Sequence, residues 1–318
     1  STGVPLAPTF QWNAVAQAAS YDLQVATDAG FVNVVYTANV VGTTHTAGTA
    51  LNTLTTYYWR VRANNACGTG AYSAAFSFTT ADIPPILLVD DDDNTPDVRA
   101  TYEAALTAAG ATWDLWDTAN SDNEPTLTDL LPYDIVIWFT GHEFGGFAGP
   151  GAAGETALAG WLDTGKCMFI SGQDYLYDRG KTAFLDTYLG VNTFSNDTGD
   201  YTSVTGQGAV FSGKGPYALT YPFTDFSDVV TADGAPAELA FLGNNNNGAA
   251  IDKDSGVYKT TFWAFPFEAT GAAADRADLM GTILSWCGAA ATIPNIDVSP
   301  LSLASTQPPD VQTVQTLT

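Results

Sequence analysis

The chain has 318 residues, of which 46% are hydrophobic, enough for two domains with cores of their own. Its 34 Asp and Glu residues against 10 Lys and Arg residues give a formal net charge of −24 at pH 7. Such a surface repels nucleic acid and anionic membranes, because few cations are available to displace the counterions of phosphate. No apolar stretch reaches the roughly 18 residues that a membrane span requires.

Low Lys content and abundant Thr, Ala, Gly and Asn indicate a secreted bacterial protein, found outside the cell or on its surface. The first residues do not form a signal peptide. They are either a mature end left by processing or an arbitrary cut, and both alternatives stay open. The acidic surface favours divalent cations or simply keeps the protein soluble.

Residues 1–81 carry short alternating segments at the spacing of an all-β sandwich. Phe10 and Trp12 stand two positions apart, as side chains on one face of a strand do. In the run from Tyr57 to Arg62, the odd-numbered side chains face one way and the even-numbered ones the other. This region is also nearly neutral in charge, so the acidic imbalance lies after it.

This segment resembles a fibronectin type III domain over essentially its whole length. Trp12 matches the family's early core tryptophan, residues 54–57 match its tyrosine corner, and residues 76–80 match its last strand. The resemblance implies a spacer or adhesion module without catalysis. We expect core packing to explain the aromatic side chains, with sugar stacking as the alternative.

After a linker at 82–85, residues 86–291 alternate between predicted strands and helices, which indicates a doubly wound parallel α/β domain. Residues 201–268 are β-rich, and either extend the sheet or cover one of its edges. The strands are predicted at 86–90, 112–117, 134–140 and 167–171, and the helices at 96–109, 126–131, 153–164, 181–189 and 273–287. Thr95 and Pro96 are the expected start of the first helix.

The phrases at 86–91, 136–141 and 169–174 carry a second resemblance. Together with the topology, they resemble the flavodoxin-like domains grouped with class I glutamine amidotransferases and with gingipain- and caspase-type cysteine peptidases. Large secreted bacterial multidomain proteins combine such a domain with a fibronectin type III module. A resemblance of architecture implies a fold more strongly than a function.

The strand ends at 90–93, 141–143 and 172–174 meet at one edge of the predicted sheet, where open α/β sheets bind ligands. His142 matches the position of the catalytic His in the caspase-like families. The nucleophilic Cys of those families follows the next strand, where this chain has Ser171 and glycine. Cys167 lies at the opposite, amino end of that strand.

No Gly-x-Cys-x-Gly or Gly-x-Ser-x-Gly elbow occurs in the sequence. A nucleophile needs a nearby base and an oxyanion hole, so we predict no catalytic residue in this chain. The alternative is a secreted hydrolase of the gingipain, caspase or amidotransferase type. It would use His142 with Ser171 and Asp174.

The run Asp90, Asp91, Asp92, Asp93 and Asn94 offers several oxygen ligands of the kind that Ca²⁺ prefers. A structural Ca²⁺ is therefore the one cofactor that the sequence suggests, and a solvated acidic edge is the other interpretation. A zinc site made of His142, Asp90 and Glu143 is a further alternative.

The three cysteines form no metal-ligand pattern. Cys167 and Cys287 either pair within the α/β domain, leaving Cys67 alone, or remain buried free thiols. Asn196 begins a glycosylation sequon, and O-linked sugar on the many Thr residues is equally open.

Residues 292–318 form an extended tail that resembles the first two strands of an immunoglobulin-like repeat in bacterial surface proteins. Two strands bury no core of their own, so we expect the tail to pack on a neighbouring copy as an added strand or on its own domain. The residues expected at that contact are Ile296, Val298, Leu301, Leu303, Val311, Val314 and Leu317.

The sequence therefore predicts a non-catalytic extracellular structural or adhesive protein, which assembles head-to-tail into filaments through its C-terminal strand segment. Its expected partners are other copies of itself, other cell-surface proteins or glycans, and not nucleic acid.

Overall fold

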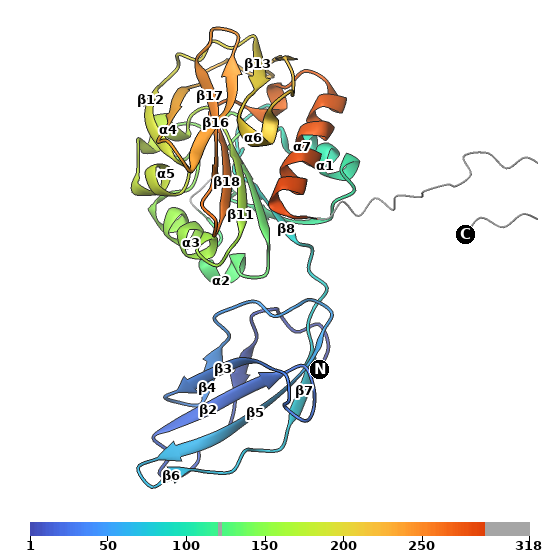
Figure 1. Cartoon of the computed structure of the whole chain (residues 1–318), viewed down its shortest axis with the longest axis vertical. Coiled ribbons are helices and arrows are strands. Elements are labelled where there is room, and N and C mark those ends of the chain that lie inside the picture. The colour runs from blue at the N-terminus through green and yellow to red at the C-terminus, as the bar shows by residue number, and fades with distance from the viewer. Residues whose placement is uncertain (120–122, 290–318) are drawn as a thin grey trace, which may run out of the picture.

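The computed structural model describes residues 1–119 and 123–289. Figure 1 shows a β-rich N-terminal part followed by a larger α/β part. The described residues contain several separate sheets and the helices α1 to α7. Within these residues no helix is both long enough and apolar enough to cross a membrane.

The N-terminal β region, residues 1–81, contains a two-stranded and a five-stranded sheet. Their inward side chains form one cluster around Leu23, Val25 and Tyr57. In β2 (Ser20–Ala26) every second residue is buried, as expected for a strand that covers a core with one face. The small sheet pairs β1 (Thr9–Gln11) with β4 (Thr44–Thr46), and the larger one contains β3 (Val34–Val40), β2 (Ser20–Ala26), β5 (Thr56–Asn65), β6 (Gly68–Thr69) and β7 (Phe76–Thr79).

The aromatic side chains of this region divide into two groups. Tyr57 is buried, and its hydroxyl accepts a hydrogen bond from the N–H of Asn52 at 3.0 Å, the geometry expected of a tyrosine corner. Trp12 and Trp59 are only partly buried, and Phe76 is 54% exposed. Core packing therefore accounts fully for the burial of Tyr57, and only in part for the positions of Trp12, Trp59 and Phe76.

The α/β region is built on one nine-stranded mixed sheet. Five strands are parallel, and the four that follow are antiparallel. Residues 201–268 thus extend the sheet, which was one of the two predicted alternatives. In spatial order the parallel strands are β9 (Trp113–Asp117), β8 (Ile86–Asp90), β10 (Ile135–Phe139), β11 (Cys167–Ser171) and β18 (Lys259–Trp263), then come β17 (Gly248–Asp254), β16 (Ala237–Gly243), β13 (Ser203–Gly206) and β14 (Tyr217–Ala218). A separate pair joins β12 (Val191–Ser195) to β15 (Val229–Ala232).

Helices cover both faces of this sheet, so its central strands are buried on both sides. In β8, Ile86 and Leu88 belong to one core cluster, while Leu87 and Val89 belong to the other. The first cluster includes side chains of α1 (Arg99–Ala108), α6 (Gly208–Phe211) and α7 (Ala273–Cys287). The second includes those of α2 (Leu127–Leu130), α3 (Ala152–Leu162), α4 (Tyr175–Arg179) and α5 (Ala183–Thr187).

The predicted start of the first helix at Thr95 and Pro96 is wrong, because α1 begins at Arg99. The N–H of Val98 donates to Oδ2 of Asp92 at 2.9 Å, and the N–H of Arg99 donates to Oδ1 of Asp97 at 2.9 Å. Two acidic side chains from before the helix therefore satisfy its first free amides, in place of the expected threonine.

Two other helices begin directly after a threonine whose side chain caps them. Thr126 caps α2 in a reciprocal capping box with Asp129, and Thr182 accepts a hydrogen bond from the N–H of Leu185 at the start of α5. The short α4 was not predicted. Of the remaining elements, β8, β11 and α7 have the predicted bounds.

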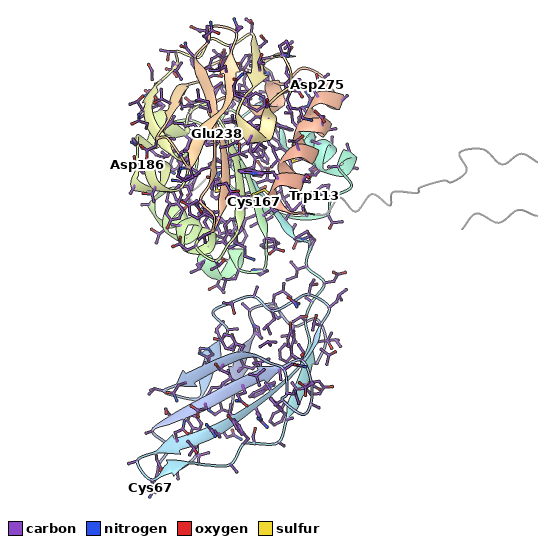
Figure 2. The ribbon with its side chains drawn as sticks, in the orientation of Figure 1. Cys67, Trp113, Cys167, Asp186, Glu238 and Asp275 are labelled. Atoms are coloured by element: carbon purple, nitrogen blue, oxygen red, sulfur yellow. A yellow bond between two sulfur atoms is a disulfide. The ribbon has the colours of Figure 1, made fainter. Side chains whose placement is uncertain are left out.

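A disulfide joins Cys167 at the start of β11 to Cys287 at the end of α7. Their Cα atoms are 5.5 Å apart, although 120 positions separate them in sequence. Of the two alternatives for these thiols, the structure shows the pair. Cys67 is a free, exposed thiol at the tip of the N-terminal β region (Figure 2).

Replacing Cys167 and Cys287 together by alanine should lower the free energy of unfolding by about 2–4 kcal/mol, because the bond closes a long loop that the unfolded chain would otherwise leave open. Urea unfolding measures the difference. Cys67→Ser is the control and should leave the urea midpoint unchanged. A double alanine variant as stable as the parent would contradict a stabilising role for this bond.

Candidate functional site

The carboxyl edge of the parallel strands is the candidate site, and comprises residues 90–94, 140–143 and 171–174. Its first acid, Asp90, forms an ion pair with Arg99 of α1, and Arg99 also binds Asp117 at 2.6 Å. Burial raises the pKa of Asp90 to about 6 even against this partner. Through this ion pair Asp90 links the end of β8 to α1.

Asp91 points to the opposite side of the sheet. Its Oδ2 accepts hydrogen bonds from Nε1 of Trp138 at 3.0 Å and from the N–H of Gly149 at 2.8 Å. Its Oδ1 accepts from the hydroxyl of Thr118 at 3.1 Å. Burial raises the pKa of Asp91 well above its usual range.

Asp92 returns to the first side of the sheet, where it binds the backbone of two loops. It accepts from the N–H of Val98 and, at 3.1 Å, from the N–H of His142. Burial raises the pKa of Asp92 to about 7. A Cβ at Gly141 would lie 2.2 Å from Cγ of Asp92, and φ is +49° there, so only glycine fits this approach.

These contacts engage side-chain oxygens that calcium binding would need. The side chains of Asp90, Asp91 and Asp92 alternate in direction, Asp93 accepts from Thr118, and Asn94 donates to Glu143 at 2.8 Å. Among the described residues, no group of three or more His, Cys, Asp or Glu side chains is arranged to hold a metal ion. The geometry thus gives no support to the predicted calcium site or to the zinc alternative.

His142 packs against aromatic side chains at the carboxyl edge. Its ring stacks on Phe223 with centroids 4.9 Å apart and an interplanar angle of 6°, and it also contacts Phe144. No hydrogen bond joins His142 to Ser171 in the part of the chain that the structure describes. The two members of the alternative catalytic pair are therefore not connected.

Ser171 is fully buried at the end of β11. Its hydroxyl donates to the carbonyl oxygen of Phe265 at 3.1 Å and accepts from the N–H of Phe267 at 2.8 Å. A Cβ at Gly172 would lie 2.0 Å from Oγ1 of Thr140, so this position does not admit a nucleophilic side chain unless Thr140 moves.

Gln173, the next side chain, is fully buried as well. Its Oε1 accepts from the N–H of Phe226 at 3.0 Å, and its Nε2 donates to the carbonyl oxygen of Thr224 at 3.2 Å. The end of β11 is thus bonded to two loops, at 224–226 and 265–267.

Two further acids lie beside this junction. Burial raises the pKa of Asp174 to about 7 and that of Asp228 to about 8, and repulsion from neighbouring carboxylates, Asp197 among them, adds to both shifts. Oδ1 of Asp228 accepts from the N–H of Asp197 at 3.1 Å, whereas Oδ2 of Asp174 is buried without a hydrogen-bond partner among the described residues. Both groups therefore hold a proton over part of the neutral pH range.

Asp228 and Glu268 were not among the predicted site residues. Glu268 is buried and accepts from the hydroxyl of Tyr102 at 2.7 Å, and burial raises its pKa to about 7. Both residues come from segments more than 50 positions after the strand end that they approach. An acid inside the otherwise apolar phrase at 264–269 was the one available signal.

Two predictions concern other parts of the chain. Asn196 lies partly buried in the turn after β12, and its Oδ1 is buried with no hydrogen-bond partner in the part of the chain that the structure describes. Its glycosylation stays a prediction. The tail at 292–318, with its proposed contact residues, lies outside the described residues.

Comparisons with known proteins find similarities that cover part of the chain. No family model and no curated protein matches the chain. An exo-β-1,4-mannosidase from Opitutaceae bacterium strain TAV5 is 14% identical over 65% of this chain, with a TM-score of 0.43, and the chain spans only 36% of that protein. A GMP synthase-like protein from Thermoplasma acidophilum is 12% identical over 64% of this chain and 96% of its own, with a TM-score of 0.44.

A Fn3-like protein from Clostridium thermocellum is 25% identical over 26% of this chain and 92% of its own, with a TM-score of 0.21. All three TM-scores are below 0.5, so these similarities carry no argument about function. The function has to be argued from the site itself.

The stability of the chain should fall as the pH rises from about 4 to about 8. The carboxyl of Asp228 has a pKa of about 8 when folded and near 3.8 when unfolded, so the folded chain binds more protons between these values. Asp228→Asn removes the contribution of this carboxyl to the dependence, while the other buried acids keep theirs, so the stability of the variant relative to the parent should increase from pH 5 to pH 9.

Urea midpoints measured from pH 5 to pH 9 test this expectation. The exposed Asp233 provides the matched control, since Asp233→Asn should follow the parent curve at every pH. Parallel curves for the parent and Asp228→Asn would show that Asp228 is ionised throughout.

Proposed function

We propose that this chain is a non-catalytic extracellular structural or adhesive protein. In this proposal the N-terminal β region is a fibronectin type III-type sandwich, and the α/β region is a doubly wound, amidotransferase-like scaffold. The disulfide between Cys167 and Cys287 supports an oxidising location outside the cytosol. The net charge of −24 supports a soluble surface that does not bind nucleic acid.

One observation carries the non-catalytic part of the proposal. At the end of β11, the polar atoms of Ser171 and Gln173 are bonded to backbone groups of the loops at 224–226 and 265–267. Both side chains are fully buried. A substrate that reached Ser171 would have to break these bonds and displace the loops.

The alternative, a hydrolase that uses His142, requires side chains at the carboxyl edge to change position and charge. The base would have to leave its stacking contact with Phe223 and come within hydrogen-bond distance of Ser171. Asp174 would have to orient the imidazole as a carboxylate, although burial holds its pKa at about 7. The structural interpretation needs none of these changes.

A fluorophosphonate probe for serine hydrolases and an acyloxymethyl ketone probe for cysteine peptidases test catalysis directly. We expect no labelling of Ser171, because its hydroxyl is buried and bonded on both sides. The experiment uses the Cys67→Ser variant, since the exposed thiol of Cys67 reacts without any catalytic activation. Mass spectrometry of the labelled peptides identifies the site.

Stoichiometric labelling of any serine or cysteine that disappears in His142→Ala would overturn the non-catalytic proposal. Equal, low labelling in both proteins supports it.

The proposal includes head-to-tail assembly through the segment at 292–318, which lies outside the described residues. Its alternating apolar side chains support an added strand on a second copy. Deletion of 292–318 should convert filaments or oligomers to monomers, as measured by light scattering and negative-stain electron microscopy.

A length-preserving variant provides a second test of assembly. Ile296→Asp with Val298→Asp keeps the tail but places two charges on its first apolar segment, and should weaken assembly as the deletion does. A full chain that stays monomeric at high concentration would contradict the assembly part of the proposal.

A further inference from the structure

A groove of about 900 Å³ lies in the N-terminal β region, far in sequence from the carboxyl edge. Aromatic and aliphatic side chains form its walls, and its volume is in the range of small-molecule clefts, about 300–1,000 Å³. Prominent among its lining residues are Trp12, Tyr21, Trp59, Val61, Tyr72 and Phe76.

The aromatic walls are held in place by contacts with one another. Phe76 stacks on Trp59 with centroids 5.1 Å apart, and Trp12 packs against Tyr21 at 5.5 Å. Tyr72 lies under the guanidinium groups of Arg60 and Arg62, at 4.0 and 4.7 Å from its ring centroid. The rings are therefore ordered before any ligand binds, which lowers the entropic cost of binding.

Phe76 gives the groove an exposed ring that the core does not require. Its side chain is 54% exposed, although Phe78 two positions later is buried. A ring face that stays in water while its neighbours are fixed is suited to stack on an apolar ligand face. This exposure also distinguishes Phe76 from the aromatic side chains that core packing explains.

Polar side chains at the mouth of the groove have unused hydrogen-bonding capacity. Gln11 and Asn13 line it and are exposed, and neither amide side chain makes a hydrogen bond within the described parts of the chain. An amide group both donates and accepts, as a hydroxyl partner requires.

The charge of this region restricts the ligand further. Residues 1–81 contain two Asp and two Arg residues, so their formal charge is zero within a chain of net charge −24. Arg62, the charged side chain that lines the groove, already binds Asp22 at 2.9 Å. A neutral ligand therefore suits the groove better than an anion or a cation.

The backbone beside the groove excludes a peptide that binds as an added strand. The N–H of Gly70 donates to the carbonyl oxygen of Ala63, and that of Ser73 donates to the carbonyl oxygen of Val61, both at 2.8 Å. The loop at 70–73 thus occupies this edge of β5. A ligand here must be recognised by side chains rather than by strand pairing.

From these observations we infer that the groove binds a neutral glycan, which stacks the C–H face of a sugar ring on Phe76 and Trp12 and exchanges hydroxyl hydrogen bonds with Gln11 and Asn13. Aromatic faces combined with free amides suit a ligand that is apolar on its ring faces and polar at its edges. The inference deepens the proposed adhesive function and rests on it.

Isothermal titration calorimetry of the full chain with cellohexaose, mannohexaose and xylohexaose tests the inference. At least one of these neutral hexasaccharides should bind. Phe76→Ala and Gln11→Ala should each weaken that binding about tenfold, which corresponds to about 1.4 kcal/mol. Both side chains are exposed, so the variants should fold, and a thermal melt checks this.

Phe147→Ala is the matched control, because Phe147 is 45% exposed but belongs to the α/β region. It should bind the hexasaccharide as the parent does. Binding that Phe76→Ala and Gln11→Ala leave unchanged would overturn the inference, as would no binding of any of the three sugars.

One further titration and a check for cleavage of the sugar separate the other outcomes. A decaproline peptide tests for a protein ligand, and its binding in place of the glycans would overturn the inference. If a bound hexasaccharide is cleaved, the non-catalytic proposal fails while the groove remains a glycan site. If no sugar binds and no catalytic labelling is seen, the groove inference alone fails.

Discussion

The hydrogen bonds of Ser171 and Gln173 determine what the carboxyl edge of the sheet is able to do. Both side chains stand at the carboxyl end of the central parallel strand β11, the edge at which open α/β sheets bind ligands. Here each binds the backbone of a loop more than 50 positions later in the chain. Buried polar atoms that are satisfied in this way are costly to release, because each would lose its partner without gaining water.

The acidic run after β8 plays a matching role on the neighbouring strand. Because successive side chains alternate in direction, Asp90, Asp91 and Asp92 reach three different structures: α1, the strand β10 with the loop at 149, and the loop at 141–142. Burial raises the pKa of each carboxyl. The run therefore fastens loops to the sheet, where its composition alone had suggested a cation site.

Local sequence patterns predicted much of the fold. The apolar run at 167–171 and the periodic segment at 273–287 have the bounds of β11 and α7, because burial of one strand and one helix face leaves a clear pattern. The predicted start of α1 was wrong because the N–H of Val98 donates to Asp92, an acceptor six positions earlier in the chain, and no local capping rule includes a contact at that separation. The helix α4 was not predicted because its 5 residues are too few to show a helical period of apolar side chains.

The candidate site was harder to predict than the fold. The order of the strands in the sequence predicted that residues 90–93, 141–143 and 172–174 meet at one edge, and the structure places the ends of β8, β10 and β11 together because parallel strands end at the same edge. It did not show the loop at 223–226, since the contacts between Phe223 and His142 and between Phe226 and Gln173 join distant segments. The exposure of Phe76 was equally hidden, because an alternating pattern does not reveal where an aromatic face remains uncovered.

Hydrogen–deuterium exchange at two backbone amides tests the closure of the carboxyl edge most directly. The N–H groups of Phe226 and Phe267 are bonded to the buried side chains of Gln173 and Ser171. We expect both amides to exchange far more slowly than those of the exposed Gly145 and Gly146. Exchange at the same rate as these exposed glycines would mean that the edge opens readily, and would contradict the account of a closed, non-catalytic scaffold.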